Sequence, residues 1–260
     1  QNNAQAIVEQ DNGIYWIADF TQGLSKLENK KILHFNEHDA QLLQSNNIQT
    51  LGMGREHDLW VGHYNNGIDI VKDDKVVESF FHNQGDTTTL SNDRITCIFR
   101  AADSTVWVGT NYGLNKYDYD SHSFKRYFSY DGLISNTIQA INEDHNGRIW
   151  ISTINGISKF DPKSEVFTNY GLEDGVDTYT FSLYCTTRDK KTGRLYFGGE
   201  NGITTFHPDS IFLHTTPPNT EILRVSVLGR HLSCDTLSKL NCCNEILKLE
   251  HEQNILDIEF

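Results

Sequence analysis

Residues 136–161 read NTIQAINEDHNGRIWISTINGISKFD, and this stretch decides the fold. A short apolar run leads into a turn, a second apolar run surrounds Trp150, and a glycine opens a third run. The same order of features recurs around further aromatic anchors at Trp16, Trp60, Trp107 and Tyr196. The anchors follow one another with a period in the low-to-middle forties and without helical periodicity. Such a period indicates the blades of a β-propeller or the units of a similar array.

Each unit carries the signals of a small antiparallel sheet. Ile138, Ala140 and Ile141 form a short apolar run typical of a buried strand, and Asn146 and Gly147 suit the tight turn that follows it. Small residues stand two positions after each anchor, at Ala18, Gly62, Gly109, Ser152 and Gly198. Glycines open each third strand, at Gly23, Gly67, Gly113, Gly156 and Gly202. We therefore predict an all-β propeller of four-stranded blades, with each anchor on a second strand and packed between sheets.

Length and composition limit the possible domain organisation and partners of the chain. Its 260 residues suffice for one large all-β domain and part of another. The formal charge of −13 argues against sequence-independent binding to nucleic acid and against an anionic membrane surface. Two prolines, Pro217 and Pro218, mark an expected boundary between blades in residues 1–216 and a second domain in residues 217–260. About five blades are expected, as part of a larger ring, and an open arc of blades is expected to associate.

The cysteines give no metal-binding pattern. Cys97 and Cys185 stand at strand positions, where a free cysteine is expected to behave as a small buried apolar residue. A hairpin can bring Cys234 to Cys242 or Cys243, and such a disulfide requires an oxidising compartment. We predict no metal site and no cofactor.

The repeat resembles a known family at this point. The pattern N-x-I-x-x-I-x-x-D-x-x-G-x-[LI]-W-[IV]-[GS]-T-x-x-G-[LI]-x-x-[YF]-D is similar to the two-component regulator propeller repeat, and it fits residues 136–161 best and residues 93–118 nearly as well. The tail, from ILRVSVLG to LEHEQNILDIEF, resembles the opening strands of the three-tyrosine (Y_Y_Y) immunoglobulin-like domain. The chain departs from the pattern at Tyr196, at residues 55–57 and 102–104, and in the RDKKTGR insertion at residues 188–194.

The resemblance implies a function. It suggests the periplasmic sensing region of a hybrid two-component system histidine kinase, with a seven-bladed ring followed by the sandwich. Members of this family detect oligosaccharides and pass the signal through a membrane helix to regulate polysaccharide-utilisation genes. The full-length protein would then be membrane-anchored and homodimeric, and this fragment would have no catalytic residues of its own.

A second class of function stays open, a secreted propeller enzyme (a lyase or glycoside-cleaving enzyme) or a lectin. Such an enzyme needs positioned acid and base groups. Paired carboxylates occur at Glu9/Asp11, Glu143/Asp144 and Glu173/Asp174. The first two pairs lie beside tight turns, where an acidic residue commonly forms the turn and carries a solvated charge.

Strand order predicts one rim of the blades as the ligand face. The turns between second and third strands and the blade-connecting loops are expected to share this rim. Its expected members are Asp19, Phe20, His63, Tyr64, Asn65, Asn111, Tyr112, Asn155, Glu200, Asn201, Tyr130, Asp131, Asp177 and Tyr179. Aromatic faces and amide or carboxylate groups suit a polar, uncharged oligosaccharide. His63, Tyr64 and Tyr112 are the strongest individual candidates, and ordinary turn chemistry remains the alternative for any one residue.

Overall fold

The computed structural model describes residues 4–10, 13–36, 43–176, 180–211, 224–232 and 255–259. It divides into two compact units, Gln1–Ile211 and Phe212–Phe260. The expected boundary at residues 216 and 217 lies outside the described residues, as do Cys234, Cys242 and Cys243, so these assignments stay predictions.

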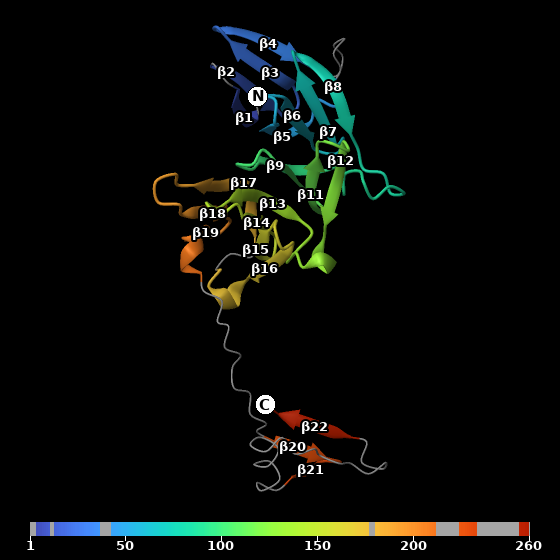
Figure 1. Cartoon of the computed structure of the whole chain (residues 1–260), viewed down its shortest axis with the longest axis vertical. Coiled ribbons are helices and arrows are strands. Elements are labelled where there is room, and N and C mark those ends of the chain that lie inside the picture. Colours follow the sequence, from blue (N-terminus) through green and yellow to red (C-terminus); the bar gives the residue numbers. More distant parts are fainter. Residues whose placement is uncertain are drawn as a thin grey trace. The chain divides into compact units, whose positions relative to one another are not determined.

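The first unit consists of antiparallel sheets whose strands pair in chain order (Figure 1). Four sheets have four strands and the last has three described strands, which confirms the predicted all-β fold of four-stranded blades. Blade 1 comprises β1 (Ala4–Gln10), β2 (Ile14–Asp19), β3 (Gly23–Glu28) and β4 (Lys31–Phe35). Blade 2 comprises β5 (Ile48–Met53), β6 (Leu59–His63), β7 (Ile68–Lys72) and β8 (Lys75–Phe80). Blade 3 comprises β9 (Ile95–Arg100), β10 (Val106–Thr110), β11 (Gly113–Asp118) and β12 (Ser123–Tyr127). Blade 4 comprises β13 (Ile138–Glu143), β14 (Ile149–Thr153), β15 (Gly156–Asp161) and β16 (Val166–Tyr170), and blade 5 comprises β17 (Phe181–Arg188), β18 (Leu195–Gly199) and β19 (Gly202–Phe206).

The second unit contains a small antiparallel sheet in the order β21-β20-β22. Its strands are β20 (Arg224–Val227), β21 (Arg230–His231) and β22 (Leu256–Glu259). The Y_Y_Y assignment of this unit stays a prediction. The helical turns that the structure describes are η1 (Ser129–Asp131), η2 (Leu172–Asp174) and η3 (Pro208–Ser210), and no described helix is long and apolar enough to cross a membrane.

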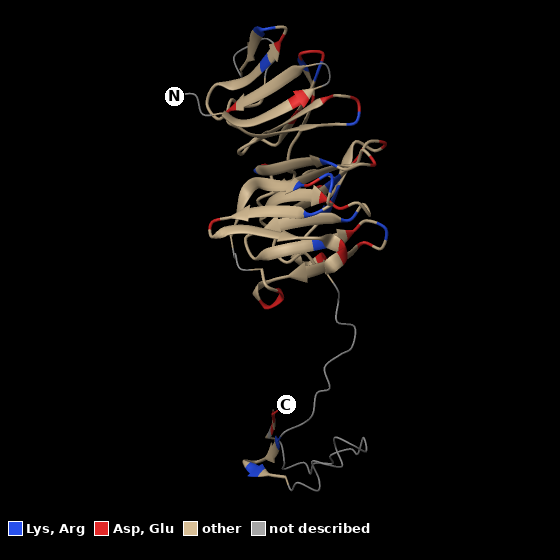
Figure 2. Cartoon of the chain, turned by 90° about the vertical axis from the view of Figure 1, so that its left-hand side faces the viewer, with Lys and Arg blue, Asp and Glu red and all other residues tan. Residues whose placement is uncertain are grey.

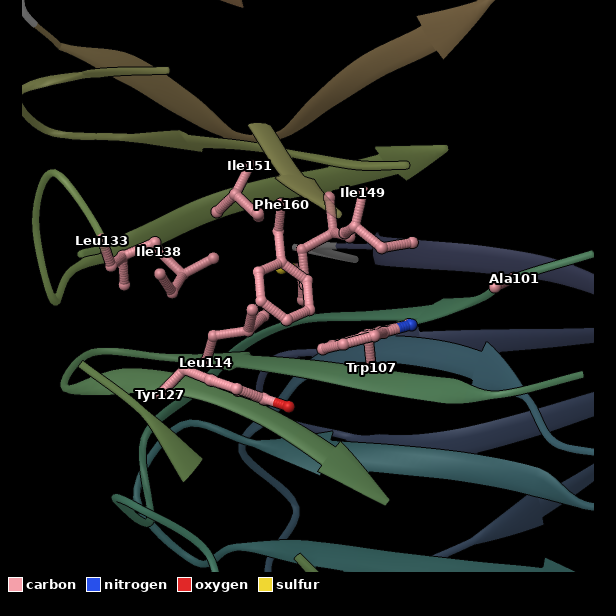
Figure 3. Packing of buried hydrophobic residues seen from close by; sticks show 11 residues of the cluster. Ala101, Trp107, Leu114, Tyr127, Leu133, Ile138, Ile149, Ile151 and Phe160 are labelled. Atoms are coloured by element: carbon pink, nitrogen blue, oxygen red, sulfur yellow. The ribbon is translucent and has the colours of Figure 1, made fainter. Parts of the chain in front are cut away.

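The tryptophan anchors lie on second strands and pack toward the following blade. Trp107 is buried, and its ring lies 5.6 Å from that of Phe160 in blade 4 (Figure 3). Truncating such a buried aromatic side chain typically costs about 3–5 kcal/mol. The same relation joins Trp60 to Tyr117 and Trp150 to Phe206, with ring centroids 4.9 and 4.7 Å apart.

Blade 5 departs from the expected burial. Tyr196 lies on the second strand, as predicted, but it is only half-buried, and Cys185 is exposed rather than buried. Within the described residues of the first unit, no further blade follows blade 5 to cover these side chains. Cys97, at the matching place in blade 3, is buried in the cluster that blades 3 and 4 share.

Two glycines show why the repeat needs them. A Cβ atom at Gly109 would lie 2.6 Å from Cγ2 of Ile138 in the next blade, so only glycine allows this approach. Gly156 has a φ of 134° where the chain turns into β15, and a Cβ there would lie 2.5 Å from the carbonyl oxygen of Tyr170.

An irregularity recurs at the second residue of the innermost strands. In β5, Ile48 pairs with His63 and Thr50 pairs with Gly62, so Gln49 has no partner in the register. The same shift leaves out Gln5 in β1, Thr96 in β9 and Gln139 in β13. We call these four residues the bulged residues.

The bulge explains the I-x-x-I spacing of the repeat. Residues three apart in a regular strand face opposite sides of the sheet. Ile48 and Leu51 nevertheless pack in one cluster toward blade 1, and Ile138 and Ile141 pack in one cluster toward blade 3. One inserted residue restores the alternation. The bulged residue consequently belongs to neither packed face of its blade.

Candidate functional site

The turns between second and third strands lie beside the segments that connect the blades. The backbone N–H of Gly67 donates to the carbonyl oxygen of Asp93 at 2.9 Å, and that of Gly113 donates to Asn136 at 2.7 Å. We call the edge formed by these turns and connections the turn rim. The opposite edge, the hairpin rim, contains the turns that join first to second and third to fourth strands, such as residues 144–148 and 162–165.

Three aromatic side chains gather on the turn rim at blade 3. Tyr112 comes from the β10–β11 turn, whereas Phe128 and Tyr130 come from the connection to blade 4. The Phe128 ring lies 5.6 Å from that of Tyr112 and 5.1 Å from that of Tyr130. Tyr112 is 53% exposed and Tyr130 is 79% exposed. We call Tyr112, Phe128 and Tyr130 the aromatic rim cluster.

Local hydrogen bonds fix the backbone under this cluster. A carboxylate oxygen of Asp131 accepts from the Phe128 N–H at 2.9 Å, and the side-chain oxygen of Asn136 accepts from the Ser129 N–H at 2.7 Å. Partial burial, with smaller contributions from Asp131 and Tyr112, raises the pKa of Tyr130 above its ordinary value. The phenol of Tyr130 is therefore a neutral hydrogen-bonding group at physiological pH. β12 ends at Tyr127, so Phe128 belongs to the connection between the blades and not to the outer strand.

A second aromatic group lies at the junction of blades 1 and 2. Phe20 and Tyr64 meet edge to face with ring centroids 5.5 Å apart. The guanidinium of Arg94 lies over the Tyr64 ring, 4.3 Å from its centroid. The backbone carbonyl of Arg94 accepts from the N–H of Asn111, which joins this group to the turn that carries Tyr112.

The other predicted rim residues are less concentrated. Asn65, Asn111, Asn155, Glu200 and Asn201 are exposed. Asp19 acts as a turn residue, because one carboxylate oxygen accepts from the N–H groups of Thr21 and Gln22. Asp177 and Tyr179 lie outside the described residues, so their place in the site stays a prediction.

His63 does not reach the surface of the turn rim, contrary to the sequence prediction. Its side chain is fully buried, and its Nε2 atom contacts the buried carboxylate of Asp69. A ligand on the rim has no access to this imidazole. Thr110 and Thr153 fill the matching position in blades 3 and 4, and each hydroxyl donates to the carbonyl oxygen of the turn glycine three residues later. In those blades the position stabilises the turn, so the residue type at position 63 alone was an ambiguous sign of a binding role.

The described members of the carboxylate pairs that accept hydrogen bonds do so from other groups of the fold. Glu143 accepts from the N–H of Ala102 at 2.8 Å, which links blade 4 to a turn of blade 3. Asp144 is buried rather than solvated as predicted, and it accepts from the indole N–H of Trp150 at 3.0 Å. Asp174 accepts from the N–H of Gly171, and Glu9 accepts from the hydroxyl of Tyr15. Asp11 lies outside the described residues.

Several clefts open on the hairpin rim. The largest one described has a volume of about 720 Å³ and a lining of mixed charge, with Asp103, Glu143, Asp161, Lys163 and Arg188 among its residues. Figure 2 shows that acidic and basic residues of the first unit gather at turns and strand ends. Within the described part of the chain, no group of His, Cys, Asp and Glu side chains has an arrangement that could hold a metal ion.

Comparison with known proteins identifies the repeats. Residues 89–112 and 132–155 match the two component regulator propeller family. The extracellular domain of a hybrid two-component system from B. thetaiotaomicron is 27% identical and covers 99% of this chain with a TM-score of 0.83. This chain spans only 35% of the length of that relative. No curated protein matches the sequence.

Two further solved structures share the propeller architecture. Virginiamycin B lyase from Staphylococcus aureus is 15% identical, with 82% of this chain and 71% of the lyase covered and a TM-score of 0.62. The catalytically inactive lyase with quinupristin gives 14% identity, 80% and 68% coverage, and the same TM-score. At this level of identity the likeness concerns the fold alone.

Proposed function

We propose, from the two-component regulator propeller repeats and the 27% identity to a hybrid two-component system's extracellular domain, that this chain belongs to the sensing region of such a system. In this proposal the chain is extracytoplasmic and does not catalyse a reaction itself. Its ligand is a neutral oligosaccharide that binds on the turn rim.

The aromatic rim cluster carries the ligand part of the proposal. Exposed aromatic rings offer apolar faces to the C–H surfaces of sugar rings. The phenol groups and the neighbouring Asn111 amide offer directed hydrogen bonds without a net charge. Because Tyr112 and Tyr130 are mostly exposed in the free chain, they can bind without a rearrangement of the core.

The proposal extends to the complete protein. Ligand binding in the periplasm would be passed through the second domain and a membrane helix to a cytoplasmic histidine kinase that regulates polysaccharide-utilisation genes. A membrane-anchored homodimer is part of this proposal. A membrane helix and kinase domain encoded downstream of residue 260 would support it.

A binding experiment tests the ligand assignment. Neutral gluco-, manno-, xylo- and galacto-oligosaccharides are screened by thermal shift, and any hit is measured by calorimetry. Tyr112→Ala and Tyr130→Ala are expected to weaken binding about tenfold each, because truncating an aromatic residue that anchors a ligand commonly costs more than about 1 kcal/mol and about 1.4 kcal/mol corresponds to tenfold.

Tyr15→Ala is the matched control, because Tyr15 is a partly exposed tyrosine on blade 1 away from the turn rim. Its binding should equal that of the unmodified chain. A hit that keeps its affinity in both rim variants would remove the site from this cluster. Conversion of the hit into shorter sugars would replace sensing by an enzymatic function.

A further inference from the structure

The innermost strands present a ring of polar residues that the packed faces do not use. Gln49, Thr96 and Gln139 are bulged residues at matching positions of three consecutive blades, and each is at least nine-tenths buried. They lie near the start of their strands, at the end where the second strand finishes, and so close to the turn rim. Because these side chains belong to neither face of a blade, they line the free edges of the innermost strands around the axis.

Blade 5 has an enlarged version of the same feature. In β17 the register moves from Phe181 opposite Gly199 to Thr186 opposite Phe197. Because Cys185 faces Gly198 as Cys97 faces Gly109, residues 182–184 stand where the other blades have one bulged residue. Tyr184 lies in this segment with a φ of 59°, a conformation that bulky residues rarely adopt. Such strain points to a function when the surrounding structure maintains it.

The Tyr184 side chain reaches residues of other blades. It packs against the cluster that blades 3 and 4 share, which contains Cys97. Burial raises the pKa of the Tyr184 phenol, and the nearby Gln49 side chain of blade 2 opposes this rise. The hydroxyl is nevertheless buried without a hydrogen-bond partner of ordinary geometry. A buried unpaired hydroxyl is unfavourable.

We propose that the polar ring of Gln49, Thr96 and Gln139 is a binding site for a hydroxyl-rich, uncharged group, and that Tyr184 occupies this site as a displaceable plug. The amides and the hydroxyl of the ring both donate and accept hydrogen bonds, which matches the hydroxyls of a terminal sugar unit. This inference rests on the proposed function, because the terminal unit belongs to the oligosaccharide held on the turn rim.

The strain and the unpaired hydroxyl make the plug easy to displace. Both features raise the free energy of the occupied state, so a ligand that takes the site needs less binding energy to move Tyr184. The apparent affinity then depends on the fraction of molecules in which the ring is open.

Two substitutions at the plug have opposite expected effects on sugar binding. Tyr184→Gly removes the ring and suits the positive φ, so it should strengthen binding of the neutral oligosaccharides named above about tenfold. Tyr184→Phe keeps the plug but removes its unpaired hydroxyl. It should raise the melting temperature of the free protein and weaken sugar binding about threefold.

Further variants separate the plug from general effects. Gln139→Met, in a Tyr184→Gly background, should cancel the gain in affinity, because it removes a polar group of the ring. Tyr170→Phe is the matched control, since the Tyr170 hydroxyl accepts from the Lys159 ammonium at 3.1 Å and lies outside both proposed sites. It should lower the melting temperature slightly and leave sugar binding unchanged.

The outcomes distinguish the axial site from the rim site. Binding that is lost in Tyr112→Ala but equal in Tyr184→Gly, Tyr184→Phe and the unmodified chain overturns the axial site and leaves the proposed function intact. Absence of binding to any sugar of the panel, in the unmodified chain and in Tyr184→Gly alike, overturns both.

Discussion

The Nε2 atom of His63 lies 2.8 Å from the Oδ2 atom of Asp69, and neither side chain is exposed to solvent. Asp69 also accepts from the backbone N–H of Gln44 at 2.8 Å and from the hydroxyl of Ser79 at 2.6 Å. The carboxylate therefore joins the third strand of blade 2 to its second strand, its fourth strand and the segment that arrives from blade 1.

Asp69→Ala should lower the free energy of unfolding by about 3–5 kcal/mol, because it leaves several buried donors without an acceptor. Asp69→Asn should be milder, since Asn115 fills the matching position of blade 3 and its side-chain oxygen accepts from the Ser91 N–H at 2.8 Å. Urea unfolding followed by tryptophan fluorescence measures both. Equal stability of the alanine variant and the unmodified chain would contradict the structural role.

Asp144 is predicted to be essential for stability rather than for chemistry. Its carboxylate accepts from the Trp150 indole at 3.0 Å and from the N–H groups of Asn146 and Arg148 in the turn. Asp144→Ala should cost about 2–4 kcal/mol in urea unfolding. Asp103→Ala, in the exposed turn of blade 3, is the control and should cost less than about 1 kcal/mol. If Asp144→Ala lowered the free energy of unfolding as little as Asp103→Ala does, the structural role of Asp144 would be wrong.

The two described cysteines should differ in reactivity. Burial raises the pKa of the Cys97 thiol to about 12, so almost no thiolate is present at pH 8, whereas Cys185 is exposed. Iodoacetamide at pH 8 should modify Cys185 in the folded protein and Cys97 only after unfolding. Peptide mass spectrometry with and without urea reads out the two sites separately. Modification of both at similar rates in the folded state would show that blade 3 opens readily.

Asp86 should make the stability of the folded chain depend on pH in the acidic range. Hydrogen bonds from the hydroxyl and the N–H of Thr88, at 2.6 and 2.8 Å, lower the pKa of this carboxyl in the folded chain. A lowered folded pKa adds stability above the unfolded pKa of about 3.9, and this contribution is lost as pH falls through the folded pKa. The melting temperature of Asp86→Asn should therefore fall less between pH 7 and pH 3 than that of the unmodified chain. Thr88→Val should reproduce part of the effect, and parallel profiles for all three proteins would argue against it.

The repeated features of the fold could be predicted from the sequence. The period of the anchors placed the second strands, and the glycine before each third strand has a positive φ in all five blades, as the turn requires. These features depend on neighbours in the chain and recur often enough to be recognised. The bulge at Gln49 was not predicted, although the I-x-x-I spacing contradicts the period of two in a strand and was a visible signal.

The candidate site was less accessible to sequence reasoning. Tyr112 and Tyr130 were placed correctly on one rim because strand order alone decides which loops share an edge. The burial of His63 was not foreseen, because it depends on Asp69 and on a connecting segment from another blade. Tyr184 escaped notice for the same reason, since its neighbours Gln49 and Cys97 come from blades 2 and 3.

The bulge in each innermost strand has a consequence for how such repeats diversify. A residue that packs on neither side of its blade can be exchanged without a compensating change in the stacking faces of the adjacent blades. Duplicated units can therefore keep their stacking surfaces while the amino acid at this one position drifts, as Gln5, Gln49, Thr96 and Gln139 already differ from the three-residue stretch before Cys185. Selection can act on the chemistry around the axis while the stacked faces of the blades stay the same.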